Sequence, residues 1–288
     1  MSIAQIDTPY QIITARMLAL LEQGTVPWQQ PWDPATGLPR NLFSQRPYRG
    51  INVWLLTAMG YTSPFWATFN QVKTAGGSVR KGERGVPAFF WKVYTKEAQE
   101  AGDEEQRFVP RYFTVFNAAQ LDGVAVPAIA VTPHRFTPIE RCAQLVDTMP
   151  NRPTIFEGHQ QAFYTPATDT LHMPTPSCFH SPEAYYAILY HELVHAVGHP
   201  SRLNRPTLTD LCLFGSPTYA KEELVAEMGA AYLCGVCGIA HATLDNSAAY
   251  LASWMQVLRD HPTMLVHAAA QAQRAADYIQ NLPPDMGG

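Results

Sequence analysis

The chain has few charged residues and no long apolar segment. Of its 288 residues, 15% are Asp, Glu, Lys or Arg and 47% are hydrophobic. These proportions are typical of a globular protein with an ample core. The longest apolar run, near residues 123–131, is too short to span a bilayer, so we expect no membrane helix. The first residues lack a basic leader followed by an apolar block, so we expect no signal peptide and a cytoplasmic protein.

Cysteine is also scarce. Five cysteines, an odd number, in a chain of 288 residues argue against a disulfide framework and fit reduced thiols in the cytoplasm. Cys234 and Cys237 have the spacing of a redox pair or of half a zinc knuckle, but no second pair accompanies them. Because this segment resembles the apolar end of a helix, we interpret both residues as buried structural cysteines.

Histidine is missing from the first 130 residues, and all ten histidines follow them. The charge changes at the same place, because residues 1–130 hold 12 basic and 10 acidic side chains and residues 131–288 hold 8 and 14. Metal chemistry is therefore expected only in the second part. The chain is also about twice the length of a usual domain. We predict two domains, 1–130 and 131–288.

The residue patterns predict an α+β protein whose second part is mainly helical with a small β-sheet. Capping residues, apolar spacing and runs of β-branched and aromatic residues carry this prediction. In the first part the expected helices are 8–23, 53–59 and 66–74 and the expected strands are 87–94 and 112–117, with an acidic loop at 97–105. In the second part the expected helices are 139–149, 182–198, 219–234, 247–259 and 262–279 and the expected strands are 153–156, 162–164 and 170–173.

The second part contains the pentapeptide His191-Glu-Leu-Val-His195. On a helix, two histidines four residues apart face the same side, so both imidazoles can bind one zinc ion. Glu192 then lies beside the metal, where its carboxylate can take a proton from a water molecule whose acidity the metal has raised. Ser181 can cap this helix with Pro182 at its first position. This context favours a metal site over a chance match on an amphipathic helix.

Zinc with an open catalytic position needs a third protein ligand. Ser201 stands where one class of peptidases carries a third histidine, and His199 is out of register for that role. On the next predicted helix, Glu223 and Glu227 share a face, whereas Glu222 does not. We predict that Glu223 is the third ligand and that Glu227 is an acceptor that orients a ligand histidine. The alternative is that these acids only solvate a helix surface.

Other parts of a peptidase site are less clearly marked. Residues 170–174 could form an edge strand on which an extended peptide substrate pairs. We interpret His172 in this strand as structural rather than as a ligand. The candidates for stabilising the oxyanion at an attacked carbonyl are Tyr219 and His199, and the sequence does not choose between them. It also identifies no protein substrate.

Acidic residues are nearly missing from residues 40–92, which hold eight basic residues and one acidic residue. Such a block is typical of an anion-binding face. Interleaved aromatic residues suit stacking on unpaired bases, although most of them would be core residues in any domain. The predicted phosphate contacts are Arg46, Arg49, Lys73, Arg80, Lys81 and Arg84. The predicted stacking residues are Tyr48, Trp54 and Trp66.

Short motifs in both halves carry a family resemblance. In the first half they are 21–28 (LEQGTVPW), 47–52 (PYRGIN), 66–71 (WATFNQ), 79–83 (VRKGE) and 115–117 (VFN). In the second half they are 185–186 (YY), 191–195 (HELVH), 198–199 (GH), 202–203 (RL) and 222–227 (EELVAE). Together they resemble the ArdC-type antirestriction proteins of conjugative plasmids over almost the whole chain.

The resemblance implies an N-terminal domain that binds single-stranded DNA without strong sequence preference and a C-terminal zincin-like metallopeptidase domain. It also implies a role in protecting incoming plasmid DNA from host restriction. With 20 basic and 24 acidic residues, the chain is a poor mimic of duplex DNA. Binding the entering strand, or cleaving a protein bound to it, is therefore the more consistent mode. Two alternatives stay open: a single-stranded DNA-binding protein with a structural zinc site, and an inhibitor that contacts the restriction enzyme directly.

Overall fold

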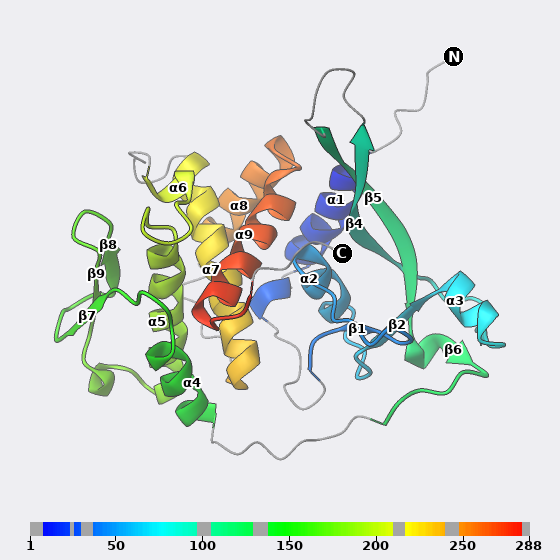
Figure 1. Ribbon diagram of the computed structural model, residues 1–288, viewed down its shortest axis with the longest axis horizontal. Helices are drawn as coiled ribbons and strands as arrows, with labels where there is room; N and C mark the ends of the chain where they lie inside the picture. Colours follow the sequence, from blue (N-terminus) through cyan, green and yellow to red (C-terminus); the bar gives the residue numbers. More distant parts are fainter. Residues whose placement is uncertain are drawn as a thin grey trace.

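The computed structural model describes residues 8–23, 26–29, 37–96, 105–128, 138–209, 217–239 and 248–283. Helices and strands are both present, which confirms the α+β class. In Figure 1, α7 and α9 lie at the centre, between a small sheet on the left and a long two-stranded ribbon on the right. Within the described residues, no helix combines the length and the apolar character needed to cross a membrane.

Helix α1 (Pro9–Glu22) begins as its sequence predicts. The Thr8 side chain accepts a hydrogen bond from the Gln11 backbone N–H, and the Gln11 side chain accepts one from the Thr8 N–H. This reciprocal capping satisfies donors that a helix start leaves unpaired. The helix buries Ile13, Met17 and Leu21 on one side and packs against α8 (Ala248–Asp260), near the other end of the chain.

The first sheet has the strand order β1-β2-β5-β4. Strand β1 is parallel to β2, and the other two pairings are antiparallel. The bounds of these strands are β1 (Arg40–Asn41), β2 (Phe65–Thr68), β4 (Val86–Lys96) and β5 (Glu105–Asn117). Around them lie η1 (Pro27–Gln29), α2 (Ile51–Thr57), α3 (Phe69–Thr74), β3 (Ser78–Val79), η2 (Ala118–Gln120) and β6 (Leu121–Asp122).

The predicted helix at 66–74 is wrong in its first part. Residues Phe65–Thr68 form the buried strand β2, and α3 starts only at Phe69. Thr68 and Gln71 form a capping box that starts the helix at this point. The apolar spacing, which placed the start at residue 66, did not take this cap into account. Of the predicted acidic loop, residues 97–104 lie outside the described residues, and Glu105 begins β5.

The second part begins with α4 (Pro138–Asp147) and a sheet of order β7-β9-β8. The bounds are β7 (Thr154–Glu157), β8 (Phe163–Thr165) and β9 (Thr170–Met173). The edge position predicted for β9 is wrong, because β9 pairs on one side with β7 and on the other with β8. Its backbone therefore has no free edge for an extended peptide.

Helices make up the remainder. They follow η3 (Pro176–Cys178) and are α5 (Pro182–Val197), α6 (Pro206–Thr209), α7 (Pro217–Cys237), α8 and α9 (Met264–Ile279). Helix α7 contacts both α5 and α9 along its length. A Cβ atom at Gly229 of α7 would lie 2.7 Å from a side-chain carbon of Val194. Glycine at this position therefore allows α5 and α7 to approach each other closely.

The two regions predicted from composition share one hydrophobic core. Trp28 packs edge-on against Trp254 with ring centroids 5.6 Å apart, and the ring centroids of Trp54 and Tyr232 are 4.5 Å apart. The Tyr232 hydroxyl also donates a hydrogen bond to the Gly50 carbonyl at 2.7 Å. Helices α1 and α2 thus complete the apolar packing of α7, α8 and α9. This hydrophobic core therefore includes residues from both sides of position 130, where the charge balance of the sequence changes.

Candidate metal centre

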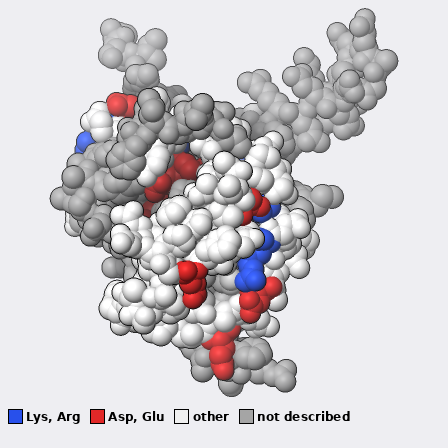
Figure 2. Space-filling model, turned by 90° about the vertical axis from the view of Figure 1, so that its left-hand side faces the viewer, with Lys and Arg blue, Asp and Glu red and all other residues white. Residues whose placement is uncertain are grey.

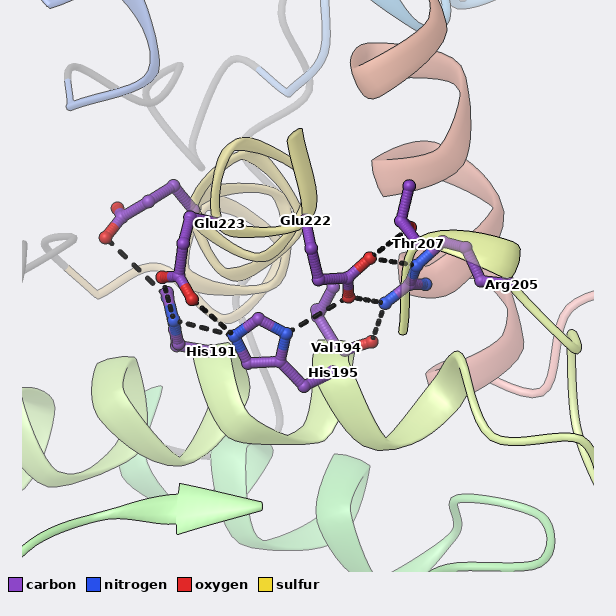
Figure 3. Close-up of polar contacts among 8 residues, drawn as sticks. His191, Val194, His195, Arg205, Thr207, Glu222 and Glu223 are labelled. Carbon is purple, nitrogen blue, oxygen red and sulfur yellow. Dashed lines mark hydrogen bonds and ion pairs between the residues drawn. The ribbon is translucent and has the colours of Figure 1, made fainter. Parts of the chain in front are cut away.

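Helix α5 presents the two histidines of the pentapeptide as its spacing predicts. Ser181 caps the helix by accepting a hydrogen bond from the Ala184 N–H at 3.2 Å, and Pro182 occupies the first turn. His191 and His195, one turn apart, bring their Nε2 atoms to 3.1 Å from each other. Figure 3 shows both rings pointing from α5 toward α7.

Glu223 reaches the same point from α7 (Figure 3). Its Oε2 lies 3.4 Å from His191 Nε2, and its Oε1 lies 3.6 Å from His195 Nε2. Ligand atoms from the three residues fall within 4.8 Å of one another. In a tetrahedral zinc site, ligand atoms about 2.0–2.1 Å from the metal are roughly 3.3 Å apart. The three side chains therefore fit a zinc ion.

Charge is concentrated where the ion would bind. Burial alone would lower the pKa of His191, but a hydrogen bond to Glu223 and the nearby Glu227 and Glu192 carboxylates raise it to about 9. Burial would raise the pKa of Glu223, but the hydrogen bond with His191 and the two imidazoles lower it to about 2. The carboxylates thus favour positive charge at this point, which a proton or a metal cation can supply.

A second layer of contacts holds His195. Its Nδ1 lies 3.1 Å from Glu222 Oε1. The Glu222 carboxylate also accepts two hydrogen bonds from the Arg205 guanidinium and one from the Thr207 hydroxyl at 2.5 Å. Arg205 in turn donates to the Val194 carbonyl at 2.8 Å, which joins the network back to α5 (Figure 3). These contacts fix the orientation of the His195 ring.

Sequence reasoning missed Glu222 and Arg205. Burial would raise the pKa of Glu222, but hydrogen bonds with His195 and Arg205 hold it well below its usual range. Glu222 is off the face that Glu223 and Glu227 share, as predicted, yet it reaches His195 because α5 and α7 lie side by side. Arg205 is a buried residue in the segment before α6. The only sequence signal for Glu222 was its place in a group of three acidic residues on α7, and no sequence signal pointed to Arg205.

Glu227 lies where the prediction placed it. Its Oε1 is 3.6 Å from His191 Nδ1, a buried nitrogen that has no hydrogen-bond partner within 3.5 Å. The role of Glu227 in orienting His191 stays a prediction.

Glu192 and Tyr219 lie at the same centre. Glu192 is buried, and its negative charge raises the pKa of both His191 and Tyr219. Tyr219 is half-buried and hydrogen-bonded to Glu223; burial and the Glu223 charge raise its pKa above the usual value. Its hydroxyl therefore keeps its proton and can donate a hydrogen bond.

The remaining histidine candidates lie elsewhere. His199 interacts through Nδ1 with the Ser201 hydroxyl at 2.8 Å, after the end of α5. His172 contacts His159 at 2.9 Å and Thr170 at 3.0 Å within the small sheet. Of the two oxyanion candidates, Tyr219 is thus the one in contact with the metal centre. Figure 2 shows the face that carries the small sheet, where charged side chains are few and acidic atoms lie in a recess.

The predicted DNA-contact residues divide into two groups. Five basic side chains are exposed, as a phosphate contact requires: Arg46, Lys73, Arg80, Lys81 and Arg84. Arg80 also lies within 4.0 Å of both Glu83 and Asp122. Arg49 differs, because it forms an ion pair with Asp277 of α9. The structure therefore gives Arg49 a role in joining α2 to α9.

Two predicted stacking residues are corrected by their burial. Trp54 is 0% exposed and Trp66 is 1% exposed, so neither ring offers a face to a base. Trp54 fills the core beside Tyr232, and Trp66 lies on the buried strand β2. Tyr48 is half-buried with its hydroxyl enclosed. The large aromatic side chains that are exposed in this region are Phe43, Tyr61, Phe69, Phe90, Trp91 and Tyr112.

Comparison with known protein families gives one match in each half. Residues 7–116 match the N-terminal domain of anti-restriction factor ArdC. Residues 144–271 match the zincin-like metallopeptidase family MPTase-PolyVal. The first match covers α1 to Phe116 of β5, and the second covers all residues of the metal centre described above.

Two curated relatives match almost the whole of this chain. The DNA primase TraC of Escherichia coli is 36% identical over 300 residues, which cover 96% of this chain but 27% of TraC. The chain thus spans about a quarter of that relative. The uncharacterized protein y4eC of Sinorhizobium fredii (strain NBRC 101917 / NGR234) is 37% identical over 289 residues, or 94% of this chain and 91% of y4eC.

Two solved structures of the antirestriction protein ArdC from plasmid R388 are also similar. The metal-free structure has a TM-score of 0.75 at 35% identity and covers 96% of this chain and 99% of ArdC. The Mn(II)-bound structure has a TM-score of 0.76 at 34% identity and covers 97% and 100%. Identity at this level over both full lengths places the chain among these proteins: it belongs to the ArdC family of antirestriction proteins.

Proposed function

We propose that this protein binds single-stranded DNA and hydrolyses peptide bonds at a zinc site, and that it protects incoming plasmid DNA from host restriction. The observation that carries the enzymatic part is the convergence of His191, His195 and Glu223 beside Glu192. Within the described part of the chain, three ligand-bearing side chains converge at this point. Three protein ligands leave a position for substrate or water, as catalytic zinc sites require and structural sites do not.

The side chains divide the chemical work. A bound zinc ion would polarise the substrate carbonyl and increase the acidity of water. Glu192 accepts the proton of the attacking water and passes it to the leaving amine. Glu222, held by Arg205, keeps His195 in the orientation of a ligand. Tyr219, protonated beside Glu223, donates a hydrogen bond to the carbonyl oxygen as its negative charge develops.

Zinc is our choice of metal because of the donor set. Two imidazole nitrogens and a carboxylate suit zinc, and the same donors accept other divalent ions of the first transition row. The R388 ArdC structure with Mn(II) supports this tolerance. Metal analysis of the purified protein, expressed without added metal, checks the assignment.

For DNA binding we propose a surface made of exposed basic and aromatic side chains. The proposed phosphate contacts are the exposed side chains of Arg46, Lys73, Arg80, Lys81 and Arg84. Tyr48, which is half-buried, is kept as a proposed stacking residue. On the β4–β5 ribbon, exposed Phe90 stands directly across from exposed Arg111, a pairing that offers a ring face and a positive charge together. A single strand with unstacked bases needs both groups.

The decisive experiment compares the wild-type protein with Glu192→Gln in a cleavage assay with and without single-stranded DNA. The variant should keep zinc and DNA binding and lose cleavage. Persistent cleavage by Glu192→Gln contradicts the mechanism. If zinc removal unfolds the second region and the wild type cuts no peptide with or without DNA, the site is structural. If Arg80→Ala/Lys81→Ala loses DNA binding yet still protects plasmid DNA, direct contact with the restriction enzyme replaces the proposal.

A further inference from the structure

Two buried cysteines from distant parts of the sequence meet behind the metal helix. Cys142 lies on α4 and Cys237 at the last position of α7, and both are free thiols. A side-chain hydrogen bond joins the two. This hydrogen bond brings the thiols of two different helices together, which is the arrangement that a disulfide between α4 and α7 requires.

Tyr190 connects this thiol pair to the metal centre. Its hydroxyl lies 3.1 Å from Cys237 Sγ and 3.4 Å from the Cys142 carbonyl oxygen. Tyr190 is fully buried and directly precedes His191 on α5. Oxidation of the thiols would therefore change the contacts of Tyr190, the residue next to a metal ligand.

A small pocket lies beside the pair. Its volume is about 240 Å³, and its lining includes Cys237 together with Arg141, Leu145 and Val236. Cys142 is 0% exposed and Cys237 is 1% exposed, so an oxidant reaches the sulfur atoms only when the ends of α4 and α7 open locally beside the pocket. A small peroxide needs a smaller opening than a protein thiol does.

The surroundings make the two thiols unequal. Hydrogen bonds from Cys142 and Tyr190, together with the positive charge of Arg141, lower the pKa of Cys237 despite its burial. The hydrogen bond to Cys237 and burial raise the pKa of Cys142. The Tyr190 hydroxyl, 3.1 Å from Cys237 Sγ, can also donate a hydrogen bond to a thiolate at that sulfur. We therefore take Cys237 as the nucleophile of the pair. Cys234, one turn earlier on α7, has its pKa raised well above normal by burial, so it is inert.

We propose that Cys237 and Cys142 form an oxidation site at which a small hydroperoxide produces a disulfide between α7 and α4, and that this bond weakens metal binding through Tyr190. First, the Cys237 thiolate attacks the peroxide, so that an S–O bond forms, the O–O bond breaks and an alcohol or water leaves after taking up a proton. The Cys142 thiol then attacks the Cys237 sulfur, so that the S–S bond forms, the S–O bond breaks and water leaves with the Cys142 proton. The two thiols lose two electrons and the peroxide gains them.

The cross-link is tested on the full-length protein. Reduced protein is treated with hydrogen peroxide, alkylated, digested without reductant and mapped by mass spectrometry. A peptide pair joining Cys142 to Cys237 is expected in the wild type and in Cys234→Ser. Cys142→Ser should instead hold Cys237 as a sulfenic acid that dimedone traps. Should that variant fail to fold, the wild-type map alone decides.

Two results overturn the cross-link. One is recovery of Cys142 and Cys237 as free thiols after the peroxide has modified the exposed Cys178. The other is a bond between Cys237 and Cys234, which would make the helical pair the reactive one.

The effect on the metal is measured separately and rests on the proposed zinc site. Oxidised wild-type protein should bind zinc several-fold more weakly than reduced protein and should recover with reductant, whereas Cys142→Ser should not change on treatment. An unchanged zinc affinity in the cross-linked protein overturns the connection through Tyr190. Failure of the reduced protein to bind zinc overturns the proposed metal function and leaves the cross-link standing.

Discussion

His195 and Glu222 lie on different helices and meet through Nδ1 and Oε1, 3.1 Å apart. This contact leaves Nε2 of His195 free to face His191 and Glu223. Because the imidazole donates from Nδ1 to a carboxylate, its other nitrogen keeps the lone pair that a metal needs. The ligand set on the two helices therefore depends on a residue that is not itself a ligand.

Replacing Glu222 by Gln should weaken zinc binding by about 10–100-fold, the usual effect of losing a carboxylate behind a ligand histidine. Competition titration with a chromogenic chelator measures the affinity. Glu183→Gln, at the start of the same metal helix and outside the site, should leave it unchanged. Equal zinc affinities for wild type and Glu222→Gln would show that His195 needs no help from Glu222.

Arg205→Met should destabilise the protein by about 3–5 kcal/mol, because it leaves the buried Glu222 carboxylate without the guanidinium that pairs with it. Arg259→Met is the matched control, since its ion pair with Glu22 is exposed and contributes about 1 kcal/mol or less. Urea unfolding followed by fluorescence compares the two. Similar losses for both variants would mean that the buried pair contributes no more than a surface pair.

Zinc binding should depend on pH up to about 9. In the metal-free protein the pKa of His191 is raised to about 9, so below that pH a zinc ion displaces a proton from this site. The apparent affinity should rise about tenfold per pH unit toward pH 9 and then level off. Calorimetry in buffers of different ionisation enthalpy counts the released protons. A flat affinity between pH 7 and 9 contradicts the raised pKa.

The contribution of His191 to the stability of the metal-free protein should fall as the pH rises, whereas the zinc affinity rises over the same range. A histidine with a raised pKa stabilises the fold fully below its unfolded value of about 6.5, and the contribution disappears as the pH rises through about 9. Glu223, with a pKa lowered to about 2, stabilises the fold above about 4.5 and loses this contribution as the pH falls toward 2. Chemical unfolding of metal-free protein at several pH values measures both. His191→Gln should remove the loss above pH 7.

Two aromatic substitutions should separate DNA binding from packing. Phe90→Ala removes an exposed ring and should weaken single-stranded DNA binding by about 1–3 kcal/mol with little effect on stability. Trp54→Ala opens a hole in the core and should destabilise the protein by about 3–5 kcal/mol. Fluorescence anisotropy with labelled DNA and thermal unfolding are the two measurements. Unchanged DNA affinity in Phe90→Ala would exclude this ring from the binding surface.

The shared core also predicts how the protein unfolds. Because Trp28 and Trp54 of the first region pack against Trp254 and Tyr232 of the second, loss of either region exposes the apolar surface of the other. Thermal unfolding of the metal-free protein should therefore show one cooperative transition. Two well-separated transitions in calorimetry would mean that the regions are stable independently.

What could be predicted from the sequence alone was local. The spacing of His191 and His195 places both on one side of any helix, and Ser181 marks where that helix starts, so the two histidines of the centre needed no tertiary knowledge. The α+β class followed in the same way from capping residues and strand-forming runs. Glu223 was reached by helical spacing once a second helix was assumed.

Tertiary structure decided the rest. Whether an aromatic side chain such as Trp54 or Phe90 is buried depends on what packs against it. The composition of residues 40–92 does not indicate that α7 and α9 pack against this segment. The central position of β9 and the pairing of Arg49 with Asp277 are likewise contacts between distant segments. Helical periodicity orders side chains around one axis, but the reach of Glu222 to His195 depends on how closely two axes approach.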